Sequence, residues 1–149
     1  MKALLQRVTE ASVSVAGEVM GRIDRGLVVL LGVASVDTEN DAKYLAQKTV
    51  NLRIFSDEAG KLNLSALDIK GELLLISQFT LLGNARKGRC PSFVEAASPA
   101  QAKELFDYFV DQARAQGLKV ETGRFQQYMQ VEIHNDGPVT ILLDSRDKF

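Results

Sequence analysis

Residues 71–82, GELLLISQFTLL, decide the fold because an unbroken apolar run in them ends abruptly in polar side chains. The run at residues 73–76 follows a glycine closely and predicts a strand buried on both faces. Four residues come next: Ser77, Gln78, Phe79 and Thr80. A buried polar group without a partner costs roughly 1–3 kcal/mol, so these side chains must be hydrogen-bonded or must face a ligand. Two interpretations stay open, a satisfied strand end and the floor of a site.

The sequence before this strand predicts antiparallel strands joined by short turns. The predicted strands are residues 2–8, 11–15, 19–23 and 27–33. Because the turns are tight, we expect an antiparallel meander and no βαβ unit at the start of the chain. Arg7 lies inside the first strand, and the base rate of burial for arginine favours a solvated position.

Two amphipathic helices are predicted, each preceded by capping residues. The first runs from about residue 39 to 51 after Asp37-Thr38, and the second begins at Ser98-Pro99 and ends at Gly117. Apolar or small side chains recur at helical spacing in both, which predicts one buried stripe per helix. The expected buried residues are Ala42, Leu45, Ala46, Thr49, Ala102, Leu105, Phe106, Phe109, Val110 and Ala113.

The remaining strands are short, and the last two are separated by a turn signature. They are predicted at residues 52–55, 118–122, 128–134 and 141–143, and residues 61–64 are predicted to form a short ordered segment. Asn-Asp-Gly-Pro at residues 135–138 predicts a turn, where Gly137 lacks a Cβ and Pro138 lacks an N–H, so that the backbone is open to close approach. Gly-Pro bonds are cis in only about 5–6% of cases, so the sequence alone predicts trans.

A basic loop follows the central strand at residues 83–91, GNARKGRCP. Arg86, Lys87 and Arg89 make it the densest cluster of positive charge in the chain. These side chains are either solvated loop charges or a grip for an RNA backbone. Phe93, just beyond, either stacks on a base or fills the core.

Composition narrows the class of protein. The 149 residues predict a single domain over residues 1–149, and 46% hydrophobic with 25% charged residues is ordinary for a soluble globular protein. The net charge of −1 gives no overall field that attracts nucleic acid, and we expect no DNA partner. Cys90 is the single cysteine, and no signal or membrane-spanning segment is evident, so we expect a cytoplasmic protein without a membrane partner.

The chain lacks a complete set of conventional catalytic groups. One cysteine and one histidine, His134, are too few for a usual zinc site, so we expect no metal and no cofactor. A triad of His134 with Ser77 or Thr80 is supported by no spacing rule, and neither standard phosphate-loop spacing occurs. The protein is therefore either a binding module or an enzyme whose reaction needs little side-chain chemistry.

Four motifs together resemble the D-aminoacyl-tRNA deacylases. LLQRV, SQFTL, KGRCPSF and NDGPVT occur in this order between residue 1 and about residue 145. The resemblance implies an α/β (α+β) fold with compact, β-barrel-like, antiparallel-rich sheets and two main helices. It also implies a homodimer with its active site at the subunit interface, acting on the ester between a D-amino acid and tRNA. Two positions depart from the family: Cys90, where arginine is usual, and Gln126-Gln127, where small residues are usual.

The same resemblance implies roles for individual residues. Gly137-Pro138 would be a cis dipeptide inserted into the partner's pocket, and Arg7 would hold it, which reverses the solvated position expected above. Its fixed carbonyl oxygens would bind the substrate ammonium, and an L side chain would clash with rigid backbone while a D side chain would point outward. Glycine would escape this exclusion. The pocket would be lined by Ser77, Gln78, Phe79 and Thr80, and tRNA would be held by Arg86, Lys87, Arg89 and Phe93.

Three function classes remain open at this stage. The favoured class is a chiral-proofreading hydrolase of tRNA esters, in which backbone N–H groups near Phe79 and Thr80 stabilise the oxyanion. The second is a non-catalytic RNA- or protein-binding dimer, which would bind charged tRNA without releasing the amino acid. The third is a small-ester hydrolase with Thr80 or Ser77 as a covalent nucleophile, although no base is evident to activate it.

Overall fold

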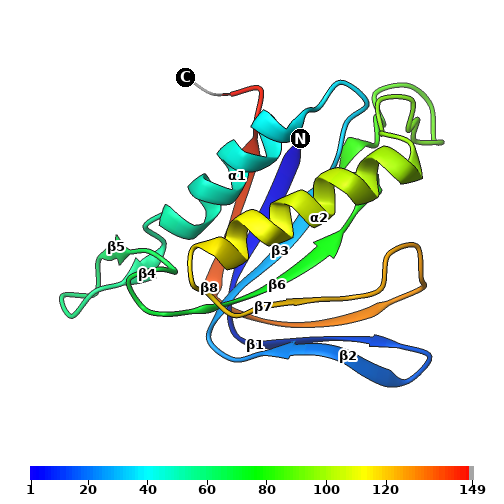
Figure 1. Cartoon of the computed structure of the whole chain (residues 1–149). Coiled ribbons are helices and arrows are strands. Elements are labelled where there is room, and N and C mark those ends of the chain that lie inside the picture. The colour runs from blue at the N-terminus through cyan, green and yellow to red at the C-terminus, as the bar shows by residue number, and fades with distance from the viewer. Residues whose placement is uncertain (148–149) are drawn as a thin grey trace.

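The computed structural model describes residues 1–147, in which two helices cross one face of a strongly bent sheet (Figure 1). The sheet contains β1 (Lys2–Val15), β2 (Glu18–Ile23), β3 (Gly26–Gly32), β6 (Glu72–Ser77), β7 (Val120–Thr122) and β8 (Gln130–Asp144). The helices are α1 (Glu39–Asn51) and α2 (Pro99–Ala115), and a small hairpin is formed by β4 (Phe55–Ser56) and β5 (Leu62–Leu64). This mixed α/β architecture with a nearly closed, barrel-like sheet confirms the predicted fold class.

The sheet is organised around β1, which is long enough to serve different partners along its length. Its first half pairs with β3 and its second half with β2, while β8 runs antiparallel beside both halves. The predicted meander is therefore wrong, because β3 pairs with β1 and not with β2. After β3 the sheet continues in parallel through β6 and β7, and α1 and α2 lie in the two connections.

Two apolar cores lie on opposite faces of this sheet. The larger core lies between the sheet and the helices and contains nine of the ten predicted helix residues, and the tenth, Thr49, is also buried. The smaller core lies where the second half of β1, with β2 and the start of β8, folds over β3 and β6. Val28, Leu74 and Ile76 belong to the smaller core and Leu73 and Leu75 to the larger one, so β6 is buried on both faces as predicted.

The helix starts follow the predicted capping chemistry with one exception. Thr38 is the N-cap of α1, and the hydroxyl of Ser98 accepts from the N–H of Gln101 at 3.3 Å at the start of α2. Asp37 does not cap α1. Its buried carboxylate accepts from the ammonium of Met1 at 2.7 Å and from the N–H of Ala34 at 2.6 Å, which ties the start of β1 to the entry of α1.

Two local predictions differ from the structure. Of the strand predicted at residues 52–55, only Phe55 lies in a strand, β4. Residues 79–82, which follow the end of β6, form the short 3-10 helix η1 (Phe79–Leu82). The strands predicted at residues 128–134 and 141–143 are one strand, β8, so residues 135–138 lie within a strand and do not end one.

Candidate active site

The Asn-Asp-Gly-Pro segment forms an outward bulge in β8. Gln6 of β1 is opposite Thr140, and Val8 is opposite Asn135. Arg7 is therefore the only β1 residue that faces residues 136–139 of β8. Four residues cannot pair with one, so this part of β8 leaves the sheet and returns to it.

Polar side chains hold the bulge at its base and along one limb. The Nε of Arg7 donates to the carbonyl of Asp136 at 2.8 Å, and its Nη1 donates to the carbonyl of Ile54 at 2.9 Å. The Arg7 side chain is only 12% exposed, so the base-rate expectation of a solvated residue is wrong. Asn135 accepts from the N–H of Val139 at 2.8 Å, which closes the bulge. The guanidinium thus joins the bulge to the chain just before β4.

The tip of the bulge is bare backbone. The Gly137-Pro138 peptide is cis, so the trans prediction from base rates is wrong, and both residues are exposed. Gly137 has a φ of +143°, which L side chains rarely adopt, and a Cβ built there would lie 2.8 Å from a methyl of Val139. Glycine is therefore required at this position by both conformation and space.

The end of β6 is held by backbone contacts. The N–H of Gln78 donates to the carbonyl of Leu31 at 2.8 Å, and η1 then packs against the end of β3. A Cβ on Gly32 would lie 2.6 Å from a methyl of Leu82 and 3.0 Å from the carbonyl oxygen of Gln78. The amide of Gln78 donates to the hydroxyl of Thr80. The N–H groups that begin a helical turn have no acceptor within it, so those of Phe79 and Thr80 are potential donors to a ligand.

These two candidate regions do not meet within one chain. Ser77 pairs with Leu31, and Leu31 pairs with Ala3, whereas Arg7 lies four residues further along β1 beside Leu27. The bulge is also three strands away from β6 in the order β8-β1-β3-β6. At about 3.3 Å per residue and about 4.8 Å per strand, the separation is on the order of 20 Å. The structure therefore brings Arg7 to Gly137-Pro138 but leaves Ser77, Gln78, Phe79 and Thr80 apart from them.

A small cavity beside Ser77 contains residues that the sequence reasoning did not assign. Its wall includes Gly123, Arg124, Phe125 and Met129, which follow β7, and its volume of about 10 Å³ suits one water molecule. A Cβ on Gly123 would lie 2.4 Å from the sulfur of Met129. The carboxyl ends of the parallel strands β6 and β7 meet here, which is where ligands bind in open α/β sheets. Residues 123–127, GRFQQ, lie between two predicted strands and were assigned to no element, and this was the only sequence signal for the cavity.

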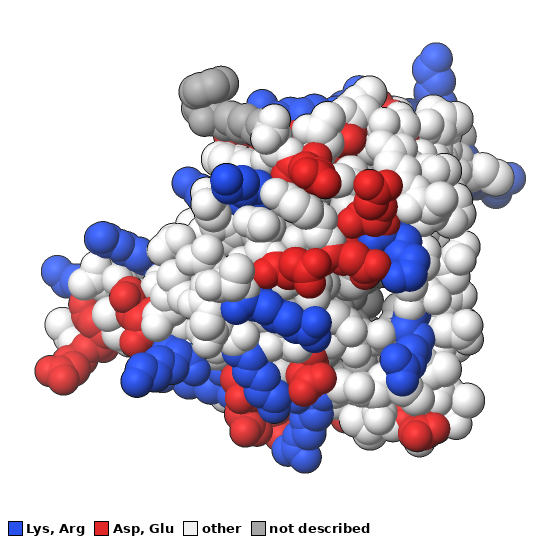
Figure 2. All heavy atoms as spheres, in the orientation of Figure 1, with Lys and Arg blue, Asp and Glu red and all other residues white. Residues whose placement is uncertain are grey.

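The basic loop is anchored next to η1. Phe93 packs edge-on against Phe79 with ring centroids 5.1 Å apart, and Asn84 and Ser92 exchange backbone hydrogen bonds at 2.8 and 2.9 Å. The charged residues of the loop are exposed: Arg86, Lys87 and Arg89. Figure 2 shows basic side chains projecting from the corner that this loop occupies in Figure 1, whereas acidic and basic groups are interspersed over the helices.

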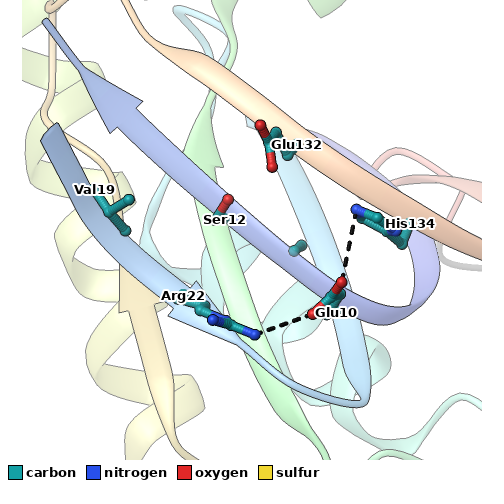
Figure 3. Close-up of a pocket in the computed structure, with 7 residues that line it drawn as sticks. Glu10, Ser12, Val19, Arg22, Glu132 and His134 are labelled. Atoms are coloured by element: carbon teal, nitrogen blue, oxygen red, sulfur yellow. Dashed lines mark hydrogen bonds and ion pairs between the residues drawn. The ribbon is translucent and has the colours of Figure 1, made fainter. Parts of the chain in front are cut away.

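A second groove, of about 280 Å³, lies on the outer face of β1, β2 and β8 (Figure 3). Glu10 lies between Arg22, at 3.1 Å, and His134, at 3.8 Å. His134 thus lines this groove, whereas Ser77 lines the small cavity described above. The geometry places no imidazole beside Ser77 or Thr80 for a triad.

Two further features of residues 1–147 bear on the class of site. Among these residues, no three His, Cys, Asp or Glu side chains gather as metal ligands would. No helix in this described part is long and apolar enough to cross a membrane.

Comparisons with known proteins agree along the whole chain. The family profile described as D-Tyr-tRNA(Tyr) deacylase matches residues 4–144. The D-aminoacyl-tRNA deacylases of Fervidobacterium nodosum and Koribacter versatilis are 59% and 58% identical over 149 residues, with 100% of each chain covered. A solved structure described as c-Myc DNA Unwinding Element Binding Protein has a TM-score of 0.91 at 44% identity, covering 97% of this chain and 98% of its own. A probable eukaryotic D-amino acid tRNA deacylase shares the fold, with a TM-score of 0.85 at 17% identity over 95% and 97% of the two chains.

Proposed function

The chain belongs to the D-Tyr-tRNA(Tyr) deacylase family, and from this premise we propose that it removes D-amino acids from tRNA in a site shared by two subunits. It is a hydrolase that acts on the ester bond of aminoacyl-tRNA. The reaction releases free tRNA and the amino acid. The match over residues 4–144 carries this conclusion, and the geometry above supports the finer proposals that follow.

Two copies are needed because the candidate residues are divided. The bulge of one chain lies on the order of 20 Å from its own β6 end. In a two-fold dimer the bulge of each copy would lie against the β6 end of the other, which produces two equal sites. The estimated separation along the sheet therefore supports a site that two subunits share.

An apolar row on the sheet face opposite the helices supports this dimer. Leu4 is the register partner of both Leu30 and Leu142, so the three side chains form one row across β3, β1 and β8. Leu142 is 57% exposed. The row is continuous across three strands, and a second copy of the chain would bury it, with Gln6 and Thr140 at its edge.

Handedness is judged by the bare backbone at the tip of the bulge. Gly137 and Pro138 have no register partner in β1, so their carbonyl groups can accept from the substrate ammonium. With the ammonium and the ester carbonyl both fixed, an L side chain points at the backbone of the bulge and a D side chain points away. Exclusion by backbone ignores what the side chain is, so all D-aminoacyl esters are accepted. Glycine has no side chain to exclude, so glycine mischarged on tRNA is also a substrate.

Hydrolysis itself requires little from side chains. Water adds to the ester carbonyl carbon, and the resulting oxyanion accepts from the N–H groups of Phe79 and Thr80. The carbon–oxygen bond to the ribose then breaks, and the ribose oxygen leaves with a proton. The neighbouring ribose 2′-hydroxyl can assist this transfer. An aminoacyl ester is already activated, so orientation and oxyanion binding supply the needed acceleration.

The competing mechanism uses Thr80 as a covalent nucleophile. A nucleophilic hydroxyl needs an adjacent general base. The only histidine, His134, is paired with Glu10 on another face, and the hydroxyl of Thr80 already accepts from the amide of Gln78. These contacts favour a role for the Thr80 backbone over its side chain.

The loop at residues 83–91 is the proposed contact for the tRNA backbone. It is exposed and basic, and the Phe79–Phe93 contact fixes its base beside the proposed oxyanion donors. Replacing Arg86, Lys87 and Arg89 by serine should raise KM without changing the preference for D over L. The slope of the logarithm of the tRNA-binding constant against the logarithm of salt concentration should become less steep by about 2 to 3.

Deacylation of matched D- and L-tyrosyl-tRNA tests the function. We expect rapid release of D-tyrosine and little release of L-tyrosine, with no dependence on the identity of the D side chain. Equal rates on the two esters would refute chiral proofreading. Tight binding without release would indicate the RNA-binding dimer, and turnover of small esters with labelling of Ser77 or Thr80 would indicate the esterase.

A further inference from the structure

We propose that Asn135 is a positioning residue that sets how strictly L-aminoacyl esters are rejected. It does so by fixing where β8 leaves the sheet and where it returns. The inference rests on the proposed function in one respect only, namely that the tip at Gly137-Pro138 judges handedness.

The side chain of Asn135 replaces the partner that β1 cannot supply to the bulge. Its Oδ1 accepts from the N–H of Val139 at 2.8 Å, and its Nδ2 donates to the carbonyl of Val139 at 3.3 Å. The Nδ2 also donates to the hydroxyl of Thr140 at 3.0 Å. The Asn135 side chain therefore joins the point where β8 leaves the sheet to Val139 and Thr140, where β8 returns to it.

The mouth of the bulge is then tied to the rest of the fold. The hydroxyl of Thr140 also accepts from the amide of Gln6 on β1 at 3.4 Å. Val139 packs against the core beneath the helices. Arg7 separately holds the outgoing limb at Asp136. The positions of Gly137 and Pro138, which carry no polar side chain, are set by these contacts on either side of them.

Loosening the mouth should alter selectivity more than rate. Exclusion by contact depends on placement to within about 0.5 Å, because a tip that yields by more than this admits the L side chain. The oxyanion donors belong to the β6 end and do not depend on Asn135. Loss of the amide should therefore raise hydrolysis of the L ester while hydrolysis of the D ester continues.

Four variants and one control, all made in the whole chain, test the proposal with matched D- and L-tyrosyl-tRNA. Asn135→Ala should lower the D-to-L ratio of kcat/KM by about tenfold or more, since three hydrogen bonds are lost. Asn135→Asp keeps the acceptor for Val139 and should fall between Asn135→Ala and the wild type. Thr140→Val should lower the ratio about threefold, and Thr140→Ser, which keeps the hydroxyl, should restore it. Asn63→Ala, at an exposed asparagine of β5, is the matched control and should keep the wild-type ratio.

A second readout separates this inference from the proposed function. Amide hydrogen exchange at Val139 should speed up in Asn135→Ala and stay slow in Asn63→Ala, whatever the substrate preference. Unchanged exchange at Val139, or an unchanged D-to-L ratio in both Asn135→Ala and Thr140→Val, would overturn the positioning role. A wild-type enzyme that treats the D and L esters alike would instead overturn the proposed function.

Discussion

The end of β6 and the bulge of β8 are both polar interruptions of a strand, yet they are held in different ways. At the end of β6, η1 lies so close to Gly32 that a Cβ there would be 2.6 Å from Leu82. At the bulge, Arg7 and Asn135 hold the chain through hydrogen bonds of 2.8 Å to Asp136 and Val139. The first region is fixed by close packing around Gly32 and the second by polar side chains.

Under the proposed function, this difference assigns one task to each region. Oxyanion binding needs donors that do not move during the reaction, and tight packing provides that rigidity. Rejection of an L side chain needs an obstacle at the right place, and a closed polar network can supply one outside the sheet. An added methyl group should disrupt the β6 end, whereas the loss of hydrogen bonds should disrupt the bulge.

Gly32→Ala should have the largest effect. The added methyl must displace the buried side chain of Leu82 and would press on the carbonyl oxygen of Gln78 and the Cβ of Leu81, each 3.0 Å away. We expect this to shift η1, and a misplacement of about 1 Å at a catalytic group can cost on the order of 100-fold. We expect kcat for D-tyrosyl-tRNA to fall by about that factor, measured by single-turnover deacylation. Gly60→Ala is the control, because its Cβ would meet nothing within 4 Å; its φ of +78° strains an alanine, whereas Gly32 has no positive φ, so the control carries the backbone strain without the close contact. Near-normal turnover by Gly32→Ala would contradict the proposed role of the β6 end in catalysis.

Arg7→Lys should have an intermediate effect, and the quantity that changes should be the selectivity for D over L esters. A single ammonium cannot reproduce the planar fork that reaches both Asp136 and Ile54, so the bulge loses one of its ties. We expect the D-to-L ratio of kcat/KM to fall about tenfold while turnover of the D ester changes little. Arg22→Lys, at an arginine whose side chain is 65% exposed, should leave the ratio unchanged. A large fall in D-ester turnover with an intact ratio would contradict the division of tasks.

Thr80→Ala should have the smallest effect. If only the backbone of residue 80 takes part, the rate on D-tyrosyl-tRNA should stay within about threefold of wild type, because a side-chain hydrogen bond to Gln78 is all that is lost. Thr80→Ser, assayed in parallel, should behave likewise. Activity that survives in Thr80→Ser and vanishes in Thr80→Ala would establish the hydroxyl as a nucleophile and refute the backbone account.

The parts of the fold that depend on local pattern were predictable. Both helices and their buried stripes follow from capping residues and 3.6-residue spacing, and β6 follows from its apolar run. The continuity of β8 was not predictable, because Asn-Asp-Gly-Pro is a turn signature that only pairing with distant β1 overrides. The predicted meander was wrong for the same reason, because β3 pairs with β1 through long-range contacts that the short turns do not determine.

The candidate site was predictable in its motifs, but the contacts that position them were not. The burial of Arg7 depends on carbonyl groups 47 and 129 residues away, which no local pattern contains. The cavity beside Ser77 is completed by Phe125 and Met129, whose segment has no regular periodicity. The sequence does not distinguish Gly32 from any other glycine at a strand end, because its importance comes from the close packing of η1 against it. Long-range packing decides each of these features.

A heterodimer with one defect in each chain tests the shared site most directly. One chain carries Gly32→Ala and the other carries Asn135→Ala with Arg7→Lys, and two affinity tags isolate the mixed species. If each site combines the β6 end of one chain with the bulge of the other, one site has both defects and the other has none. We therefore expect the heterodimer to recover fast and D-selective deacylation, which neither homodimer should show. A heterodimer that stays as unselective as the bulge variant alone would place the whole site within one chain and contradict the account.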